Sequence, residues 1–158
     1  MKPLLLDLNV ILGVILDRRP GADAAAALWA AIEEGHGRGL IPAHGLTTVF
    51  YQLEKARGAT FARDGVERLI SVFGVAPVNE AVVRRALLFA WSDFEDAVGA
   101  AAAEASGCEA MVTRDPAGYP KAPLPVIDPG RRSELVDPGI EPAAVVSGQK
   151  NRLTCWSR

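Results

Sequence analysis

Short apolar runs alternate with longer stretches of helical periodicity along most of this chain, and that alternation is its strongest constraint on folding. Strands that are separated by helices cannot pair as hairpins, so they pair in parallel and the helices cover both faces of their sheet. We therefore predict an α/β fold, a three-layer α/β/α sandwich around a central parallel sheet of about five strands. The expected strands are Pro3–Leu6, Gly39–Ala43, Val75–Val78, Glu109–Thr113 and Pro125–Ile127.

Apolar side chains recur at helical spacing between these strands, which indicates the faces that pack inward. In the helix expected over Glu80–Ala90, the spacing predicts that Val83, Leu87 and Leu88 face the core. Five large aromatic residues also stand at helical spacing, and we expect them chiefly in the core or at a dimer face. They are Trp29, Phe50, Tyr51, Phe61 and Phe73.

Length and composition suit one domain with a single core, because 158 residues carry a hydrophobic content of 49%. The pattern of strands and helices fails beyond about Asp128, where prolines interrupt the chain and the last residues are polar and basic. We predict a domain over residues 1–136 and a peripheral or disordered tail over residues 137–158.

Charge and cysteine content argue against several classes of protein. The net charge of −2 gives no global positive field, so a nucleic acid would have to be held locally or through metal. The two cysteines, Cys108 and Cys155, lack the spacing of a zinc site or a disulfide framework. No signal peptide or bilayer-length apolar run is recognisable, so we expect a cytoplasmic protein with no membrane partner.

Aspartates stand where elements of the predicted fold end or begin. Asp7 follows the first strand, Asp115 follows the fourth, and Asp93 and Asp96 lie three residues apart at the start of a helix. If the order of the sheet reverses between those two strands, the carboxylates line one crevice. Like charges in such a cluster either take up protons or bind a cation, and oxygen ligands favour Mg²⁺ or Mn²⁺.

Each of these acids also has a purely structural interpretation. Ser92-Asp93-Phe94-Glu95 matches a capping box, so Asp93 can serve the helix start alone. Asp96 can be a first-turn charge that complements the helix dipole, and Asp115 before a proline is a common turn sequence. An acid seldom ends a buried strand without a partner, so the joint pattern with Asp7 favours a site.

Three ordered motifs in this chain resemble those of PIN-domain ribonucleases, most closely the toxin-like proteins of the VapC type. They are Leu-Leu-Leu-Asp-Leu-Asn-Val-Ile-Leu at 4–12, Asp-Phe-Glu-Asp-Ala-Val-Gly-Ala-Ala-Ala-Ala at 93–103 and Met-Val-Thr-Arg-Asp at 111–115. The resemblance spans roughly residues 3–135. It implies an α/β/α sandwich and hydrolysis of RNA phosphodiester bonds with Mg²⁺ or Mn²⁺. It also implies a homodimer and a small antitoxin partner, as in a toxin–antitoxin pair.

Site residues carry over by position. Asp7, Asp96 and Asp115 match the metal-site acids of the family, and Asp93 matches an acid that is frequent in the subgroup whose motif reads Asp-Phe-Glu-Asp. The resemblance implies that Asp93 orients a water or a second ion. Arg114, beside Asp115, can reach a phosphate, although an arginine after a strand is more often solvated surface.

The chain departs from the family pattern at two positions. Family members usually carry a Glu on the helix after the second strand, where this chain has Thr48, and Glu54 stands six residues later on another part of the helix. We therefore expect the site to bind metal more weakly or to hold only one ion. A Thr or Ser often follows the first aspartate, and here it is Leu8. Asn9, one residue on, keeps a polar group that can orient Asp7 or a metal-bound water.

Two other functions compete with a ribonuclease. A phosphohydrolase of the haloacid dehalogenase kind needs a second Asp two residues after the first, and Asn9 at that position argues against it. A catalytically degenerate PIN-like module that binds RNA or a partner stays open because of Thr48. His36 and His44, both near glycines, are predicted to be surface residues. The basic pairs, of which Arg18 and Arg19 are one, are expected to be solvated or to rim an RNA groove.

Overall fold

A five-stranded parallel sheet forms the centre of the molecule, as expected. The computed structural model describes residues 2–134, so the predicted tail over 137–158 lies outside the described residues. The strand order is β3-β2-β1-β4-β5, and every neighbouring pair is parallel. The order of the sheet therefore reverses at β1, which pairs with β2 on one side and β4 on the other. The strands are β1 Leu4–Leu6, β2 Gly39–Pro42, β3 Gly74–Ala76, β4 Ala110–Val112 and β5 Val126–Ile127.

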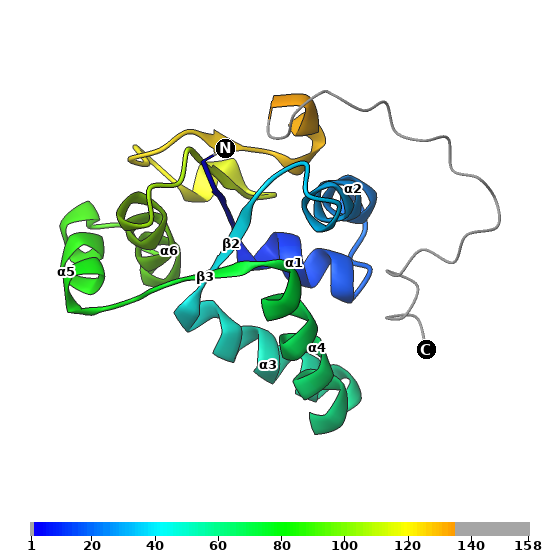
Figure 1. Cartoon of the computed structure of the whole chain (residues 1–158). Coiled ribbons are helices and arrows are strands. Elements are labelled where there is room, and N and C mark those ends of the chain that lie inside the picture. Colours follow the sequence, from blue (N-terminus) through cyan, green and yellow to red (C-terminus); the bar gives the residue numbers. More distant parts are fainter. Residues whose placement is uncertain (1, 135–158) are drawn as a thin grey trace.

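Helices cover both faces of the sheet and complete the predicted three-layer α/β/α sandwich. In Figure 1, α5 and α6 lie on one side of the strands, and α1 and α2 lie on the other. None of the helices over residues 2–134 is both long and apolar enough to cross a bilayer. The α-helices are α1 Leu8–Ile15, α2 Ala22–Glu33, α3 Ala43–Arg57, α4 Ala59–Val72, α5 Glu80–Phe89 and α6 Phe94–Ala105; short 3₁₀ turns, η1 and η2, span Pro116–Gly118 and Pro129–Glu134.

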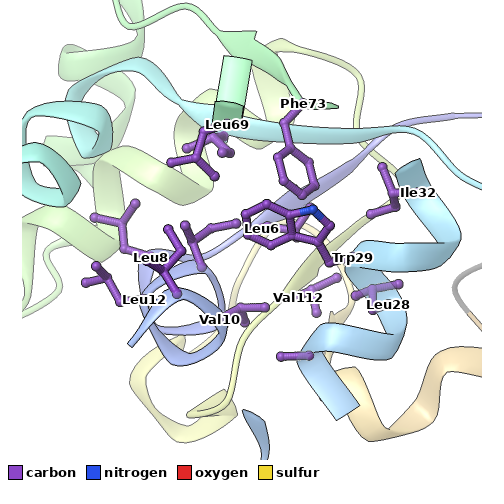
Figure 2. Packing of buried hydrophobic residues seen from close by; sticks show 14 of the residues in the cluster. Leu6, Leu8, Val10, Leu12, Leu28, Trp29, Ile32, Leu69, Phe73 and Val112 are labelled. Carbon is purple, nitrogen blue, oxygen red and sulfur yellow. The ribbon is translucent and has the colours of Figure 1, made fainter. Parts of the chain in front are cut away.

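Strand side chains alternate between the two layers, because successive residues of a strand point to opposite faces. Leu4 and Leu6 of β1 pack into a core cluster with α1, α2, α3 and α4, whereas Leu5 packs into a second cluster with α5 and α6. Figure 2 shows the first cluster, in which the rings of Trp29 and Phe73 meet edge to face with centroids 4.8 Å apart. Both rings are buried as predicted.

In the second cluster, α6 meets the sheet mainly through small side chains. Its buried residues include Ala97 and the run Ala100–Ala103, and the helix lies against β1, β2 and β4. Alanine projects only a methyl group, so a helix with an alanine face packs close to a sheet. The first turn of α6, which carries Asp96, is thereby held near the carboxyl ends of β1 and β4.

The inward face of α5 is not the predicted one. Leu87 and Leu88 were expected to face the core, but their side chains are 61% and 76% exposed. The helix instead buries Val82 and Ala86, which are one turn apart on a single stripe. Helix α5 packs against α6 by this one narrow face, so residues one and two positions further along point to solvent.

One of the five aromatic residues lies outside the core, so for it only the dimer-face alternative stays a prediction. Tyr51 is 58% exposed, whereas Phe50 and Phe61 are half-buried against the first cluster. Helix α3 buries Val49 and Leu53, four residues apart. Tyr51 lies midway between them in sequence, and a shift of two residues turns a side chain to the opposite face of a helix.

Candidate active site

A cavity of about 250 Å³ opens at the carboxyl ends of the strands, where β1 and β4 lie side by side. Four carboxylates from three segments of the chain line it. Asp7 follows β1, Asp115 follows β4, and Glu95 and Asp96 come from the first turn of α6. The structure thus brings together the three aspartates that the sequence analysis assigned to a metal site, and it adds one acid that was not assigned.

Thr113, the residue after β4, links the two strand ends. It is fully buried, and its hydroxyl donates to the Asp7 carboxylate at 2.7 Å. The same oxygen accepts from the Asn9 amide at 3.0 Å and from the backbone N–H of Asp115 at 3.1 Å. The Asn9 carbonyl in turn accepts from the backbone N–H of Arg114 at 3.2 Å. Asn9 therefore acts on Asp7 through Thr113, so the orienting role expected of it is indirect.

Asp7 has a carboxylate that is largely removed from water. It is the N-cap residue of α1, yet its side chain makes no capping hydrogen bond and faces the cavity instead. Burial raises the pKa of Asp7 above its ordinary value, and the hydrogen bond from Thr113 opposes that rise. Asp7 is therefore held by a hydrogen bond in surroundings that disfavour its ionised form.

Asp96 is the second perturbed acid. Burial, followed by the nearby charge of Asp7, raises the pKa of Asp96 to about 6. The buried Tyr119 donates its hydroxyl to Asp96 Oδ1 at 3.1 Å. Burial raises the pKa of Tyr119 as well, and the two carboxylates add to that rise, so the phenol stays a donor. Tyr119 was not among the predicted site residues, because its position depends on the loop after β4.

Asp96 and Asp115 approach each other around a glycine. A Cβ atom added at Gly118 would lie 3.3 Å from Asp96 Oδ2 and 3.5 Å from Asp115 Oδ2. The two carboxylates therefore converge on space that a side chain at this position would fill. The absence of that side chain leaves room between the acids for a water or a small cation.

Asp93 lies at the helix start and does not line the cavity. Its carboxylate accepts from the backbone N–H of Asp96 at 3.1 Å and caps α6. The structural interpretation of Asp93 as the cap of this helix is thus confirmed. Asp93 acts on the site by fixing the first turn of α6 and by adding negative charge near Asp96.

Thr48, at the position where the family usually has Glu, lines the same cavity. Its hydroxyl donates to Glu95 Oε1 at 3.2 Å. A carboxylate from α6 therefore reaches the place on α3 where an acid was expected. Glu95 was not among the predicted site residues, because its neighbours Asp93 and Asp96 matched the motif positions.

His44 was predicted to be a surface residue, and this prediction is wrong. The helix α3 begins at Ala43, so His44 lies in its first turn and lines the cavity. Burial lowers the pKa of His44, and the negative charge of Glu95 opposes that effect. Its Nδ1 atom is buried without a hydrogen-bond partner among the described residues. The glycine that follows it suggested a loop, but a helix tolerates one glycine.

Arg114 is not among the residues that line the cavity, and its guanidinium is engaged elsewhere. Its guanidinium donates to the backbone carbonyl of Pro20. It also packs against Gly13, where an added Cβ would lie 2.7 Å from its Nη1 atom. Arg114 thus ties the turn between α1 and α2 to the end of β4.

The three aspartates offer the kind of ligand atom that a hard divalent cation prefers. Asp7, Asp96 and Asp115 offer oxygen atoms alone, and no salt bridge among residues 2–134 involves any of them. Within this part of the chain, however, no group of three or more His, Cys, Asp or Glu side chains is arranged to hold a metal ion. The acids fit Mg²⁺ or Mn²⁺ without forming a ready-made coordination cage.

We expect the Asp96→Asn variant to be more stable than the native protein at pH 7.5 without divalent ions. The raised pKa means that folded Asp96 keeps its proton between about pH 4 and 6, where the unfolded chain has lost it. Stability therefore falls as pH rises through this window, and asparagine removes the penalty. Urea unfolding in EDTA at pH 4 and 7.5 measures the effect. The prediction fails if the advantage of the variant does not shrink at pH 4.

Comparison with known proteins places the chain in a family. A family profile described as PIN domain matches residues 3–117, which is well over half of the chain. No curated protein matches the sequence significantly.

Similar folds occur among solved structures. The structure of DNA-bound VapBC from Salmonella typhimurium aligns with a TM-score of 0.65 and 17% identity, over 82% of this chain and 99% of the other. VapBC2 from Rickettsia felis, bound to a promoter DNA fragment, aligns with a TM-score of 0.62 and 12% identity, over 80% and 98%. The Mycobacterium tuberculosis VapC20 toxin, described as cleaving the sarcin-ricin loop, gives 0.57 and 18%, over 68% and 86%. At these identities the likeness concerns the fold, and the family profile identifies the sequence. The chain belongs to the PIN-domain family.

Proposed function

We propose that this protein is a divalent-metal-dependent endoribonuclease that hydrolyses RNA phosphodiester bonds, and that it is the toxin of a toxin–antitoxin pair. The observation that carries the proposal is the convergence of Asp7, Asp96 and Asp115 on one cavity at the switch point of the sheet. Membership of the PIN-domain family supports a nuclease. The structural likeness to VapC20, described as a toxin that cleaves the sarcin-ricin loop, supports RNA as the substrate.

The residues of the cavity have distinct roles in this proposal. Asp7, Asp96 and Asp115 would hold Mg²⁺ or Mn²⁺, which supplies Lewis acidity and offsets negative charge on the scissile phosphate. Thr113 fixes the rotamer of Asp7, and Tyr119 fixes that of Asp96. These hydrogen bonds hold the acids in place before substrate arrives, so that little reorganisation is needed for the reaction.

The position of Glu95 favours a catalytic site over a PIN-like binding module that has lost catalysis. The degenerate interpretation rests on Thr48, which removes an expected acid from α3. The hydrogen bond from Thr48 to Glu95 positions another carboxylate at that wall of the cavity. The site therefore keeps four acids, although their arrangement differs from the family pattern.

We also propose an antitoxin partner. Two of the similar structures are VapBC complexes that are described as bound to DNA. The resemblance of the sequence to VapC-type proteins led to the same expectation. A homodimer and a cytoplasmic location remain predictions from the sequence.

The test is cleavage of a mixed single-stranded RNA substrate by the full chain, with Mn²⁺ and with EDTA. We expect shortened RNA products in the reaction with Mn²⁺ and none in the reaction with EDTA, because the acids need a cation to balance their charge. An RNA-binding module that has lost catalysis would shift the RNA in a native gel and leave its length unchanged under both conditions. Intact RNA in the presence of Mn²⁺ would therefore reject the nuclease, and intact RNA that is also shifted in the native gel would favour the binding module.

A further inference from the structure

We propose that Arg18 is a substrate-binding residue, whose guanidinium contacts an RNA phosphate at the cavity that holds the acids. This inference rests on the proposed function. Within the described residues, Arg18 is the only lysine or arginine that lines the cavity. A phosphate that approaches four carboxylates meets repulsion, and a cation on the cavity wall offsets part of it.

The guanidinium of Arg18 is free to bind a ligand, in contrast to that of its neighbour. Arg19 pairs with Asp23 at 2.7 Å and with Asp17 at 3.3 Å. Arg18 makes no side-chain hydrogen bond or salt bridge with another described residue. The two adjacent arginines of this turn therefore differ in their partners. Arg19 pairs with surface carboxylates, whereas Arg18 lines the cavity without a partner among the described residues.

The turn that carries Arg18 is fastened to the site. The backbone N–H of Arg18 donates to the carbonyl of Gly13 at 3.0 Å. The guanidinium of Arg114 donates to Pro20 on the far side of the turn and packs against Gly13 and Gly21. Arg114 directly precedes Asp115, so the turn and the strand end that carries one of the acids are held together.

Arginine suits this role chemically. Its planar guanidinium forms paired hydrogen bonds with phosphate oxygens and stays charged at any working pH. The net charge of −2 gives the chain no general attraction for RNA, so a local contact carries more weight. For single-stranded nucleic acid, each phosphate contact contributes roughly 0.7 to the slope of log affinity against log salt.

The experiment compares Arg18→Gln with Arg19→Gln in the full chain. Binding of a labelled single-stranded RNA is measured by fluorescence anisotropy in EDTA over a series of KCl concentrations. We expect Arg18→Gln to raise Kd about tenfold. The slope of log affinity against log salt should become shallower by roughly 0.7. Arg19→Gln should stay within about twofold of native. The Arg18→Lys variant should recover part of the affinity, because it restores charge without the planar fork.

Two outcomes separate this inference from the proposed function. If native protein cleaves RNA with Mn²⁺ but the two glutamine variants bind alike, Arg18 is not the contact and the nuclease stands. If native protein does not cleave, yet only Arg18→Gln weakens binding, the contact stands and the nuclease is wrong. Equal losses in both variants would indicate general charge attraction and would overturn the inference.

Discussion

The Asp96→Asn variant should retain the native fold and lose Mn²⁺-dependent RNA cleavage by at least about a hundredfold. The substitution removes the charge of one of the three aspartates that converge on the cavity. Asparagine keeps the size of the side chain and an oxygen that can accept from Tyr119, so the hydrogen bond at 3.1 Å can persist. Gel analysis of RNA products over time measures the loss. Circular dichroism checks the fold.

Asp64→Asn is the matched control for that variant. Asp64 is an exposed residue of α4 and does not line the cavity, so the same chemical change there should leave cleavage unaltered. Addition of Mn²⁺ should raise the melting temperature of native protein more than that of Asp96→Asn, because a ligand that binds the folded state stabilises it. Cleavage by Asp96→Asn at the native rate would contradict the assignment.

Thr113→Val is expected to weaken both the fold and the site. Valine matches threonine in shape but leaves the Asp7 carboxylate, the Asn9 amide and the backbone N–H of Asp115 without the partner that Thr113 provides. Loss of a buried hydrogen-bond partner costs about 1–3 kcal/mol. We therefore expect the free energy of unfolding to fall by about that amount and cleavage to fall about tenfold or more.

Urea unfolding and RNA cleavage measure the two effects of this variant. Thr60→Val, an exposed position near the start of α4, is the control and should change both quantities little. A Thr113→Val protein with native stability and native activity would show that the hydroxyl does not organise the site. Loss of stability with full activity would limit Thr113 to a structural role.

The fold could be predicted because its signal is distributed along the chain. Five apolar runs separated by helical patterns leave a parallel sheet as the consistent arrangement, and the structure confirms it. Individual faces were harder to predict. Leu87 and Leu88 fit a helical stripe as well as Val82 and Ala86 do, and only the packing of α5 on α6 decides between them.

Three of the four acids that line the cavity, Asp7, Asp96 and Asp115, were predicted from the sequence, because each stands at the end or start of an element. Glu95 was not predicted, because its neighbours matched the motif positions. Thr113 lies within a motif that was recognised, but a threonine that ends a strand is common and carries no sign of its three hydrogen bonds. Tyr119 and His44 enter the cavity through the loop after β4 and the first turn of α3. Such placements depend on tertiary structure, so the local sequence does not reveal them.

The pairing of β1 with β4 has a consequence for the synthesis of the protein. Asp7 and Thr113 are 106 residues apart in sequence and meet through a single hydrogen bond. A growing chain that has not yet reached β4 lacks Thr113, Asp115 and Tyr119, so it cannot assemble the acid cluster. If the acid cluster carries the proposed cleavage, a nascent chain or a fragment that ends before β4 is expected to lack that activity.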